Sequence, residues 1–270
     1  AGVFYGLKTL RQLIEPTLTG EGAAATVDIP LGSILDWPDL AERGEWGGSA
    51  NRDIEWMSER KMNLVESHCK SLQVTDEGRG VAEFDLSLIE RGAACAVKVV
   101  PIITHLDQLE RTGLFKVYPQ TLGEGDPKSW PYGGTTVKPA CFSKPETARV
   151  LGDWMVSLAQ RPEVADICVW LSEHHVACAC EECQKKGQFT LEAEAVSRGY
   201  ELAHQVRPDI RLRVLLTQGS YEFNDQIIAT LPPEIGFTYY DGGKTYDSSR
   251  KEMIYPLLEE YAAGGGRLGC

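Results

Sequence analysis

The sequence lacks several features that would place it in common classes of protein. It contains no apolar run of the roughly 18 residues that a membrane-spanning helix needs, and no signal peptide opens it. Basic residues are outnumbered, since 27 Lys and Arg stand against 39 Asp and Glu, for a formal net charge of −12. Phosphate backbones are bound by clustered Lys and Arg, so we expect no nucleic-acid partner. A neutral or cationic ligand suits this charge better.

Short β-forming runs alternate with amphipathic helical segments along most of the chain. The predicted strands are Leu40–Trp46, Met62–Cys69, Val97–Leu106, Asp166–Ser172, Ile210–Gln218, Glu234–Asp241 and Arg267–Cys270. The predicted helices between them are Asn51–Met62, Glu146–Gln160, Leu191–Val206 and Ser248–Ala263. This alternation predicts parallel β/α units and an α/β fold of the (β/α)8 TIM-barrel type that is truncated after about its seventh strand. The alternative is an open doubly wound sheet, but its glycine-rich phosphate-binding turn is absent after the first strand.

The segment before the predicted barrel has a different pattern. It contains an amphipathic helix over Ala1–Ile14, a linker of small residues at Gly20–Ala25 and a short strand at Thr26–Ile29. An amphipathic helix buries its apolar face against another element. We therefore expect residues 1–30 to be the remnant of an upstream domain and its linker, and residues 31–270 to be the barrel. We also expect a periplasmic or secreted protein whose signal peptide lies outside this segment.

Glu173 directly follows the predicted fourth strand and is the leading candidate for a catalytic residue. Active sites of TIM barrels lie where the strands end, so a carboxyl at this place suits general acid catalysis. A solvated glutamate at the edge of a loop is the alternative. A second carboxylate would act as base or nucleophile, and the candidates are Glu45, Asp241 and Glu66, in that order.

Further polar and aromatic side chains are expected on the same face of the barrel, where they would bind the substrate. They are Arg43, Glu45, His68, Tyr239, Asp241 and, in the long connection after the third strand, Trp130. Arginine presents a planar fork that suits paired hydroxyls, and flat aromatic rings suit stacking on sugars. The alternatives are an ion pair of Arg43 and Glu45 at the rim, and aromatic residues that only anchor the loop.

The cysteines at positions 178, 180 and 183 have the tight spacing of a thiolate metal site. A tetrahedral ion needs a fourth ligand, for which we choose Cys141, with His174 and His175 as alternatives. Zinc is the expected metal, and four cysteines would make a closed, structural site. Reduced thiols or a disulfide are the other interpretation. No organic cofactor is expected.

Five stretches of the sequence carry a family resemblance. They are Phe4–Leu13, Ile29–Gly44, Lys61–Leu64, Val100–Glu110 and Cys141–Glu146. The first resembles the last helix of the small α/β domain that precedes the barrel in family 20 glycoside hydrolases, the β-N-acetylhexosaminidases. The others resemble the lead-in to that family's first strand, its second and third strands and the start of the next helix. Uncharacterised bacterial relatives with a cysteine cluster after strand four are a closer comparison than true hexosaminidases.

The resemblance implies roles for individual residues. In that family an Asp-Glu pair closes strand four: the Glu is the general acid/base, and the Asp orients the acetamido group of the substrate, which is the nucleophile. The matching pair is Ser172-Glu173, so Glu173 inherits the acid/base role, whereas Ser172 cannot supply the charge of the Asp. Arg43 matches an arginine that holds sugar hydroxyls, and His68 matches a histidine of strand two. A substrate other than a simple N-acetylhexosaminide is therefore expected.

Three functions remain open from the sequence. The first is a glycoside hydrolase with Glu173 as general acid, and the second is a carbohydrate-binding barrel that has lost its chemistry. Both require a carbohydrate partner. The third is a zinc-dependent hydrolase that uses His174 or His175. An ion held by four cysteines leaves no open position and would exclude this third function.

Overall fold

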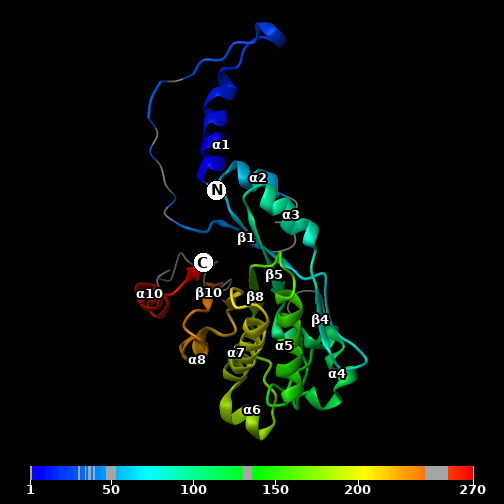
Figure 1. Cartoon of the computed structure of the whole chain (residues 1–270). Coiled ribbons are helices and arrows are strands. Elements are labelled where there is room, and N and C mark those ends of the chain that lie inside the picture. Colours follow the sequence, from blue (N-terminus) through cyan, green and yellow to red (C-terminus); the bar gives the residue numbers. More distant parts are fainter. Residues whose placement is uncertain are drawn as a thin grey trace.

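A computed structural model describes residues 2–29, 31–33, 35, 38, 40–46, 53–129, 136–240 and 255–269. Seven parallel strands form one curled sheet in the order β1-β2-β5-β8-β9-β10-β11 (Figure 1). Their bounds are β1 Gly44–Trp46, β2 Leu64–His68, β5 Lys98–Ile103, β8 Asp166–Trp170, β9 Arg211–Leu216, β10 Gly236–Tyr239 and β11 Leu268–Gly269. Each of these strands lies beside the previous one of the same sheet, with helices in between, as in a (β/α)8 barrel. The predicted fold class is confirmed.

The helices cover the outer face of this sheet. They include α2 (Ile54–Glu59), α3 (Leu86–Ala94), α5 (Pro145–Ala159), α7 (Gln188–Val206), α8 (Asn224–Thr230) and α10 (Pro256–Ala263). Helices α5 and α7 lie side by side (Figure 1). Their backbones approach closely because Gly152 faces Gly199: a Cβ on Gly199 would lie 3.2 Å from the Cα of Gly152. In the chain, α5 precedes and α7 follows β8, the strand that leads to Glu173.

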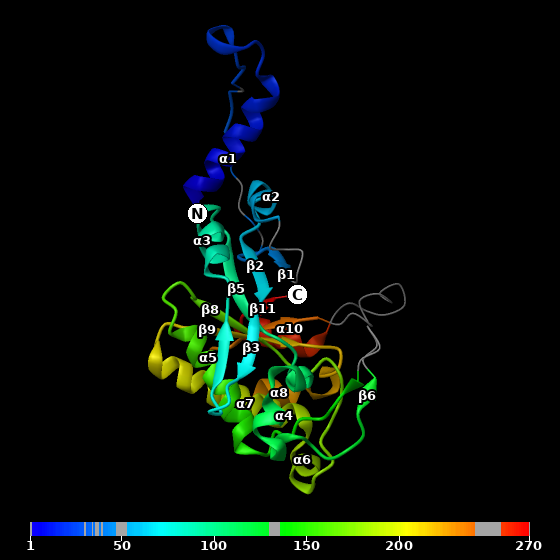
Figure 2. The same ribbon diagram turned by 90° about the vertical axis from the view of Figure 1, so that its right-hand side faces the viewer.

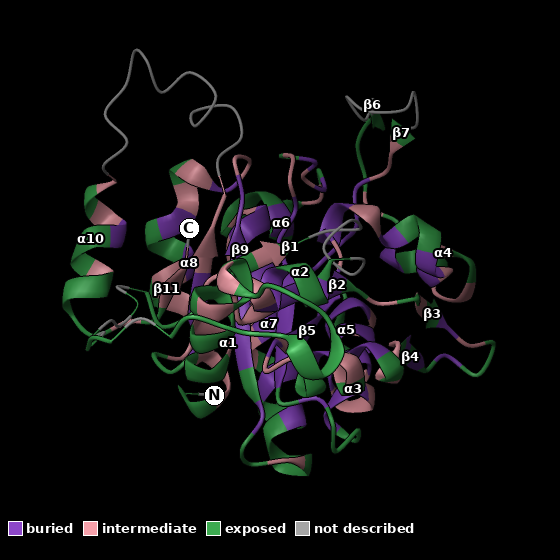
Figure 3. Cartoon of the chain, turned by 90° about the horizontal axis from the view of Figure 1, so that it is seen from above, coloured by how far each residue is buried: buried purple, intermediate pink, exposed green. Residues whose placement is uncertain are grey.

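Alternate residues of the strands point to opposite faces of the sheet. Side chains on the inner face form one buried cluster, made of Val100, Ile102, Cys168, Trp170 and Leu215. Their neighbours along the same strands, such as Ile103, Val169 and Leu216, pack outward beneath the helices. Seen from above in Figure 3, the buried residues gather along the strands and the helix faces that cover them. This is the layered core expected of a curled parallel sheet.

A buried network of charges fills the inside of the sheet at the amino-terminal ends of the strands. Arg213 Nη2 donates to Asp166 Oδ2 at 2.7 Å, and its Nη1 lies 3.3 Å from Glu66 Oε1 and 3.1 Å from Glu42 Oε2. Lys98 Nζ adds a contact of 3.0 Å to Asp166 Oδ2. Burial raises the pKa of the Glu66 carboxyl, while Arg213 opposes that shift. Glu66, a candidate second carboxylate, is therefore an ion-pair partner of Arg213 here.

The first helix, α1 (Gly2–Ile14), projects from the amino-terminal end of the barrel (Figures 1 and 2). Its Tyr5 hydroxyl donates to Ala96 O at 2.8 Å, and Lys8 pairs with Glu59. The strand predicted at Thr26–Ile29 is wrong, because only an isolated bridge joins Thr19 to Thr26 and the backbone continues without a ladder.

Two elements between the second and third strands of the barrel were not predicted. A hairpin of β3 (Ser71–Val74) and β4 (Gly80–Glu83) packs against α5, and α3 follows it. Asp85 caps α3, since its carboxylate accepts from Ser87 N at 3.2 Å. Among the described residues, no helix has the length and apolar character needed to cross a membrane.

Candidate functional site

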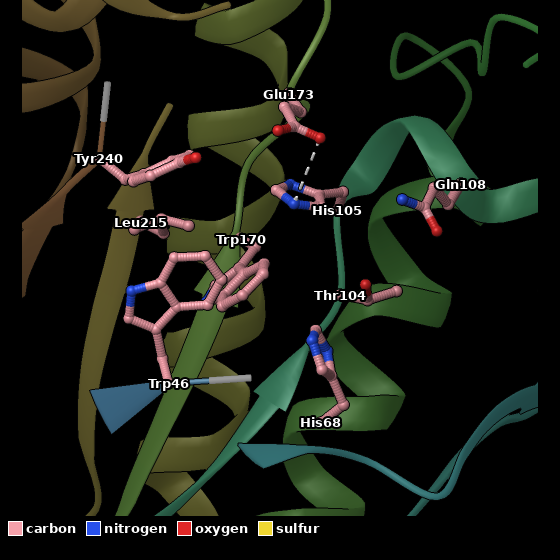
Figure 4. A pocket seen from close by; sticks show the side chains of 9 residues that line it. All are labelled: Trp46, His68, Thr104, His105, Gln108, Trp170, Glu173, Leu215 and Tyr240. Carbon is pink, nitrogen blue, oxygen red and sulfur yellow. Dashed lines mark ion pairs between the residues drawn. The ribbon is translucent and has the colours of Figure 1, made fainter. Parts of the chain in front are cut away.

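A hollow of about 440 Å³ lies at the carboxyl ends of the strands (Figure 4). The residues that line it are Trp46, His68, Thr104, His105, Gln108, Trp170, Glu173, Leu215 and Tyr240. They lie at or after the carboxyl ends of six different strands, from β1 to β10. The chemistry of TIM barrels is carried by side chains at this end of the strands. The hollow is therefore the candidate functional site.

Glu173 and His105 face one another across the hollow. Glu173 Oε2 lies 3.8 Å from His105 Nε2, the contact drawn as a dashed line in Figure 4. The other ring nitrogen, Nδ1, lies 2.9 Å from Leu171 O. Because a carbonyl oxygen only accepts, Nδ1 carries a proton and Nε2 is the nitrogen directed at the carboxylate. At this distance the two groups are neighbours without a direct hydrogen bond.

Three aromatic rings form one wall of the hollow. Trp170 packs edge-on against Trp46, with ring centroids 5.1 Å apart, and Trp46 packs in turn on Tyr240 at 5.3 Å. The imidazole of His68 lies 4.8 Å from the Trp170 ring. Burial, followed by the nearby His105, lowers the pKa of His68, so His68 is neutral near pH 7. The wall is uncharged and mostly aromatic, as in many sites that bind small organic ligands.

The backbone that carries Glu173 is held from behind by a buried carboxylate, Glu192 of α7. It accepts hydrogen bonds from Ser172 N at 3.0 Å, Ser172 Oγ at 2.5 Å and Gln188 Nε2 at 2.8 Å. Thr217 Oγ1 donates to Ser172 O at 2.7 Å from the next strand. Burial raises the pKa of Glu192 to about 7. The sequence did not single out Glu192, although it lies on the buried face of α7 together with Val196 and Gly199.

The loop after Glu173 is fixed by a second acid. His174 N donates to Asp107 Oδ2 at 3.1 Å, and the same oxygen lies 3.5 Å from His174 Nδ1. The hydrogen bond to Asp107 raises the pKa of His174. Asp107 is buried at the start of the short helix η4 (Leu106–Thr112). Its carboxylate therefore ties the loop after β8 to the segment after β5.

The residues predicted from the sequence to form the site do not all meet there. Glu173 and His68 line the hollow. Ser172 does not line it, because its hydroxyl is directed to Glu192. Arg43 donates to the backbone carbonyls of Leu40 and Lys61 at the amino-terminal end of β1.

Two predicted side chains lie one position away from a lining residue. Glu45 is not among the lining residues, and its neighbour Trp46 takes that place. Tyr239 packs on Tyr255, with ring centroids 5.3 Å apart, whereas Tyr240 lines the hollow. Trp130 and Asp241 lie outside the described residues.

Four cysteines come together about the loops on the same side of the barrel. Cys141, Cys178, Cys180 and Cys183 have sulfur atoms that all lie within 4.8 Å of one another. Cys141 Sγ lies 3.8 Å from Cys180 Sγ and 3.7 Å from Cys183 Sγ. With metal–sulfur bonds of about 2.3 Å, a regular tetrahedron has sulfur–sulfur edges of about 3.8 Å. The cluster therefore has the size to hold one tetrahedral metal ion, and the group contains no histidine.

Neighbouring donors support these sulfurs. Glu124 N donates to Cys178 Sγ at 3.3 Å, and Ser143 Oγ lies 3.0 Å from Cys141 Sγ. A backbone hydrogen bond from Cys183 lowers the pKa of Cys180 to about 7, whereas burial raises that of Cys183 to about 12. A bound cation would favour the thiolate form of every sulfur. The cluster joins the segment before α5 to the loop after β8, which also carries Glu173.

The fold resembles that of known carbohydrate-active enzymes. One similar structure is a glycoside hydrolase family 20 β-N-acetylglucosaminidase, with a TM-score of 0.62 and 18% identity over 99% of this chain and 58% of that chain. A second is the family 20 exo-β-N-acetylglucosaminidase of Vibrio harveyi, with a TM-score of 0.61 and 12% identity over 99% and 46%. A third is a β-N-acetylhexosaminidase of Bacteroides fragilis, with a TM-score of 0.57 and 16% identity over 100% and 56%.

These identities support a shared fold, and the chain spans about half the length of the enzymes it resembles. No protein-family model matches the sequence, and no curated protein is similar to it. The resemblance inferred from the sequence thus holds at the level of a family-20-like barrel.

Proposed function

We propose that the protein is a glycoside hydrolase in which Glu173 is the general acid/base. The observation that carries this proposal is the place of Glu173: it lines a hollow with three aromatic rings at the carboxyl end of the fourth barrel strand. The similarity of the fold to glycoside hydrolases supports a carbohydrate substrate. In the proposed reaction Glu173 protonates the oxygen of the scissile glycosidic bond, while a sugar ring stacks on Trp46, the exposed tryptophan of the hollow.

His105 has a positioning role in this proposal. Its Nδ1–H is held by the carbonyl of Leu171, so Nε2 stays directed at Glu173. Gln218 Nε2 lies 3.3 Å from the other carboxylate oxygen, Oε1. The hydrogen bond from Gln218 to one oxygen and the His105 ring beside the other limit the rotamers of Glu173, which favours proton transfer along a fixed direction.

The proposed substrate is not a simple N-acetylhexosaminide. The family 20 mechanism needs an Asp beside the acid/base to orient an acetamido nucleophile, and Ser172 stands at that place. The hydroxyl of Ser172 is already donated to Glu192, a buried group of α7. In the proposed reaction, residue 172 therefore supplies no charge to stabilise an oxazolinium-like intermediate.

We propose in addition that the cluster of four cysteines binds one structural zinc ion. Four thiolates complete a tetrahedral shell and leave no open position for water, so the ion would hold loops together. Zinc-dependent hydrolysis by His174 or His175 is set aside for that reason. No organic cofactor enters the proposed reaction.

A carbohydrate-binding barrel without catalysis is the second candidate function. It is favoured by the observation that Glu173 is the single carboxylate among the described residues that line the hollow. A hydrolase needs a second group as base or nucleophile, and Asp241, which follows Tyr240, is the candidate from the sequence.

Hydrolysis of a broad panel of natural oligosaccharides, followed by chromatography of the released sugars, tests the two candidates. For a hydrolase, Glu173→Gln should lower turnover by at least about 100-fold, the usual contribution of a general acid. Glu222→Gln, on the short helix at Tyr221–Phe223, is the matched control and should leave turnover unchanged. Unchanged turnover of Glu173→Gln would refute the assignment of the acid. Tight binding of a sugar without turnover would favour the second candidate.

A further inference from the structure

A second hollow adjoins the one that contains Glu173. It has a volume of about 430 Å³ and lies between the end of β2, the start of β3 and the helix η4. His68, Thr104 and Gln108 line both hollows. A ligand that occupies the first hollow can therefore extend into the second across these three side chains.

The two hollows differ in charge. Lys70 and Arg111 line the second hollow, and no Asp or Glu is among its described lining residues. The first hollow contains one carboxylate, Glu173, and no Lys or Arg among its lining residues. The chain as a whole has a formal net charge of −12, so the two cations beside the candidate site differ in sign from most of the molecule's charge.

Arg111 has hydrogen-bonding capacity that its neighbours do not use. Its Nη1 donates to Gln108 Oε1 at 3.3 Å, and no ion pair of Arg111 is found among the described residues. Lys70 pairs with Asp85 at 3.4 Å, but both side chains are largely exposed and such a pair is weak. A guanidinium offers five N–H donors in a planar fork that matches the oxygens of a carboxylate or sulfate.

The helix that carries Arg111 is anchored beside the loop that carries Glu173. Both Arg111 and Asp107 belong to η4, and Asp107 holds the loop that follows Glu173. Leu106 and Leu109 of the same helix are buried in the main core, so the helix is anchored. Hydroxyl and amide groups of Ser71 and Gln73 complete the polar lining of the second hollow.

We propose that the second hollow is a subsite for an anionic group of the saccharide, bound through Arg111. The ligand is an acidic oligosaccharide whose uronate carboxylate or sulfate ester lies one sugar away from the ring in the Glu173 hollow. Lys70 adds a point charge, and neutral His68 and Gln108 supply hydrogen bonds at the junction. This inference rests on the proposed function for the identity of the ligand as a saccharide.

Binding measured by calorimetry with the Glu173→Gln variant tests this subsite apart from catalysis. The probes are tetrasaccharides of three kinds: hyaluronan as a uronate, carrageenan as a sulfate ester, and cellulose and chitin fragments as neutral sugars. At least one acidic probe should bind, and Arg111→Met should weaken it by about tenfold or more, the usual loss of a charge-assisted hydrogen bond. The acidic probe that binds identifies carboxylate or sulfate as the preferred group.

Arg79→Met is the matched control, since Arg79 is exposed in the β3–β4 turn and lines neither hollow. It should leave the affinity unchanged. The proposal is overturned if Arg111→Met binds the acidic probe as tightly as its parent, if only neutral probes bind, or if no acidic probe binds. None of these outcomes depends on turnover, so the assignment of Glu173 is judged separately by its own hydrolysis assay.

Discussion

Glu192 offers a sharp test of how the site is supported. The carboxyl is fully buried behind Ser172, and its pKa is raised by that burial to about 7 from an ordinary value of 4.5. A difference of this size corresponds to roughly 3 kcal/mol, at about 1.4 kcal/mol for each tenfold change in proton affinity. The unfolded chain ionises near pH 4.5, whereas the folded chain keeps the proton up to about pH 7.

The two pKa values of Glu192 make the stability of the folded chain depend on pH. Protonated Glu192 stabilises the folded chain fully below pH 4.5, and this contribution is lost as the pH rises through 7. Glu192→Gln removes the ionisation but keeps a polar group that can bond to Ser172. The unfolding free energy of the parent minus that of Glu192→Gln should therefore fall by roughly 3 kcal/mol between pH 4.5 and pH 8.

Urea denaturation followed by tryptophan fluorescence at four pH values measures this difference. Other titrating groups are common to both chains and cancel. Glu201→Gln, an exposed position on the same helix, is the control and should run parallel to the parent. Parallel profiles for the parent and Glu192→Gln would refute the reasoning, because they would mean that Glu192 ionises alike in the folded and unfolded chains.

Three further predictions follow from particular contacts. Gly219→Ala should lower turnover and also lower the free energy of unfolding by about 1–3 kcal/mol, because the added Cβ would lie 2.4 Å from Glu173 O. Activity assays and thermal melting curves measure these two effects. Unchanged activity and melting would contradict close packing at this loop. Arg213→Met should cost about 3–5 kcal/mol in urea denaturation, since it leaves the buried Glu66 without its cation and removes one of the cations that pair with Asp166. A loss below about 1 kcal/mol would contradict a buried network. Plasma mass spectrometry should find one zinc ion per chain. The zinc content should fall in Cys141→Ser but not in Cys95→Ser, since Cys95 lies outside the cluster. Equal metal content in both variants would exclude the site.

The sequence predicts the fold better than it predicts the site. The seven parallel strands follow from β-forming runs separated by helical periodicity, which are local signals. The β3–β4 hairpin was missed although Gly78 takes a φ of 83° in its turn, a conformation that glycine favours. Its strands are only four residues each, too short for a clear alternation to show.

Within the hollow, two predicted residues are offset by one position from a lining residue. Trp46 lines the hollow in place of Glu45, and Tyr240 in place of Tyr239. Side chains of a strand alternate between two faces, so a shift of one residue exchanges the inner for the outer set. Predicted strand bounds differ from the observed ones by up to four residues, as at the start of β1, which is not precise enough to choose the face. Glu173 and His68 were predicted because they stand where a strand ends, where position alone suffices.

The cysteine cluster has a consequence for assembly. Its cysteines come from two β/α units, because Cys141 precedes α5 while the other three follow β8. If the cluster binds the proposed ion, the three cysteines after β8 would meet it first, and Cys141 would join them only once α5 has docked beside α7. Metal affinity would then report on that docking, and loss of the ion would mark chains in which this part of the barrel has opened.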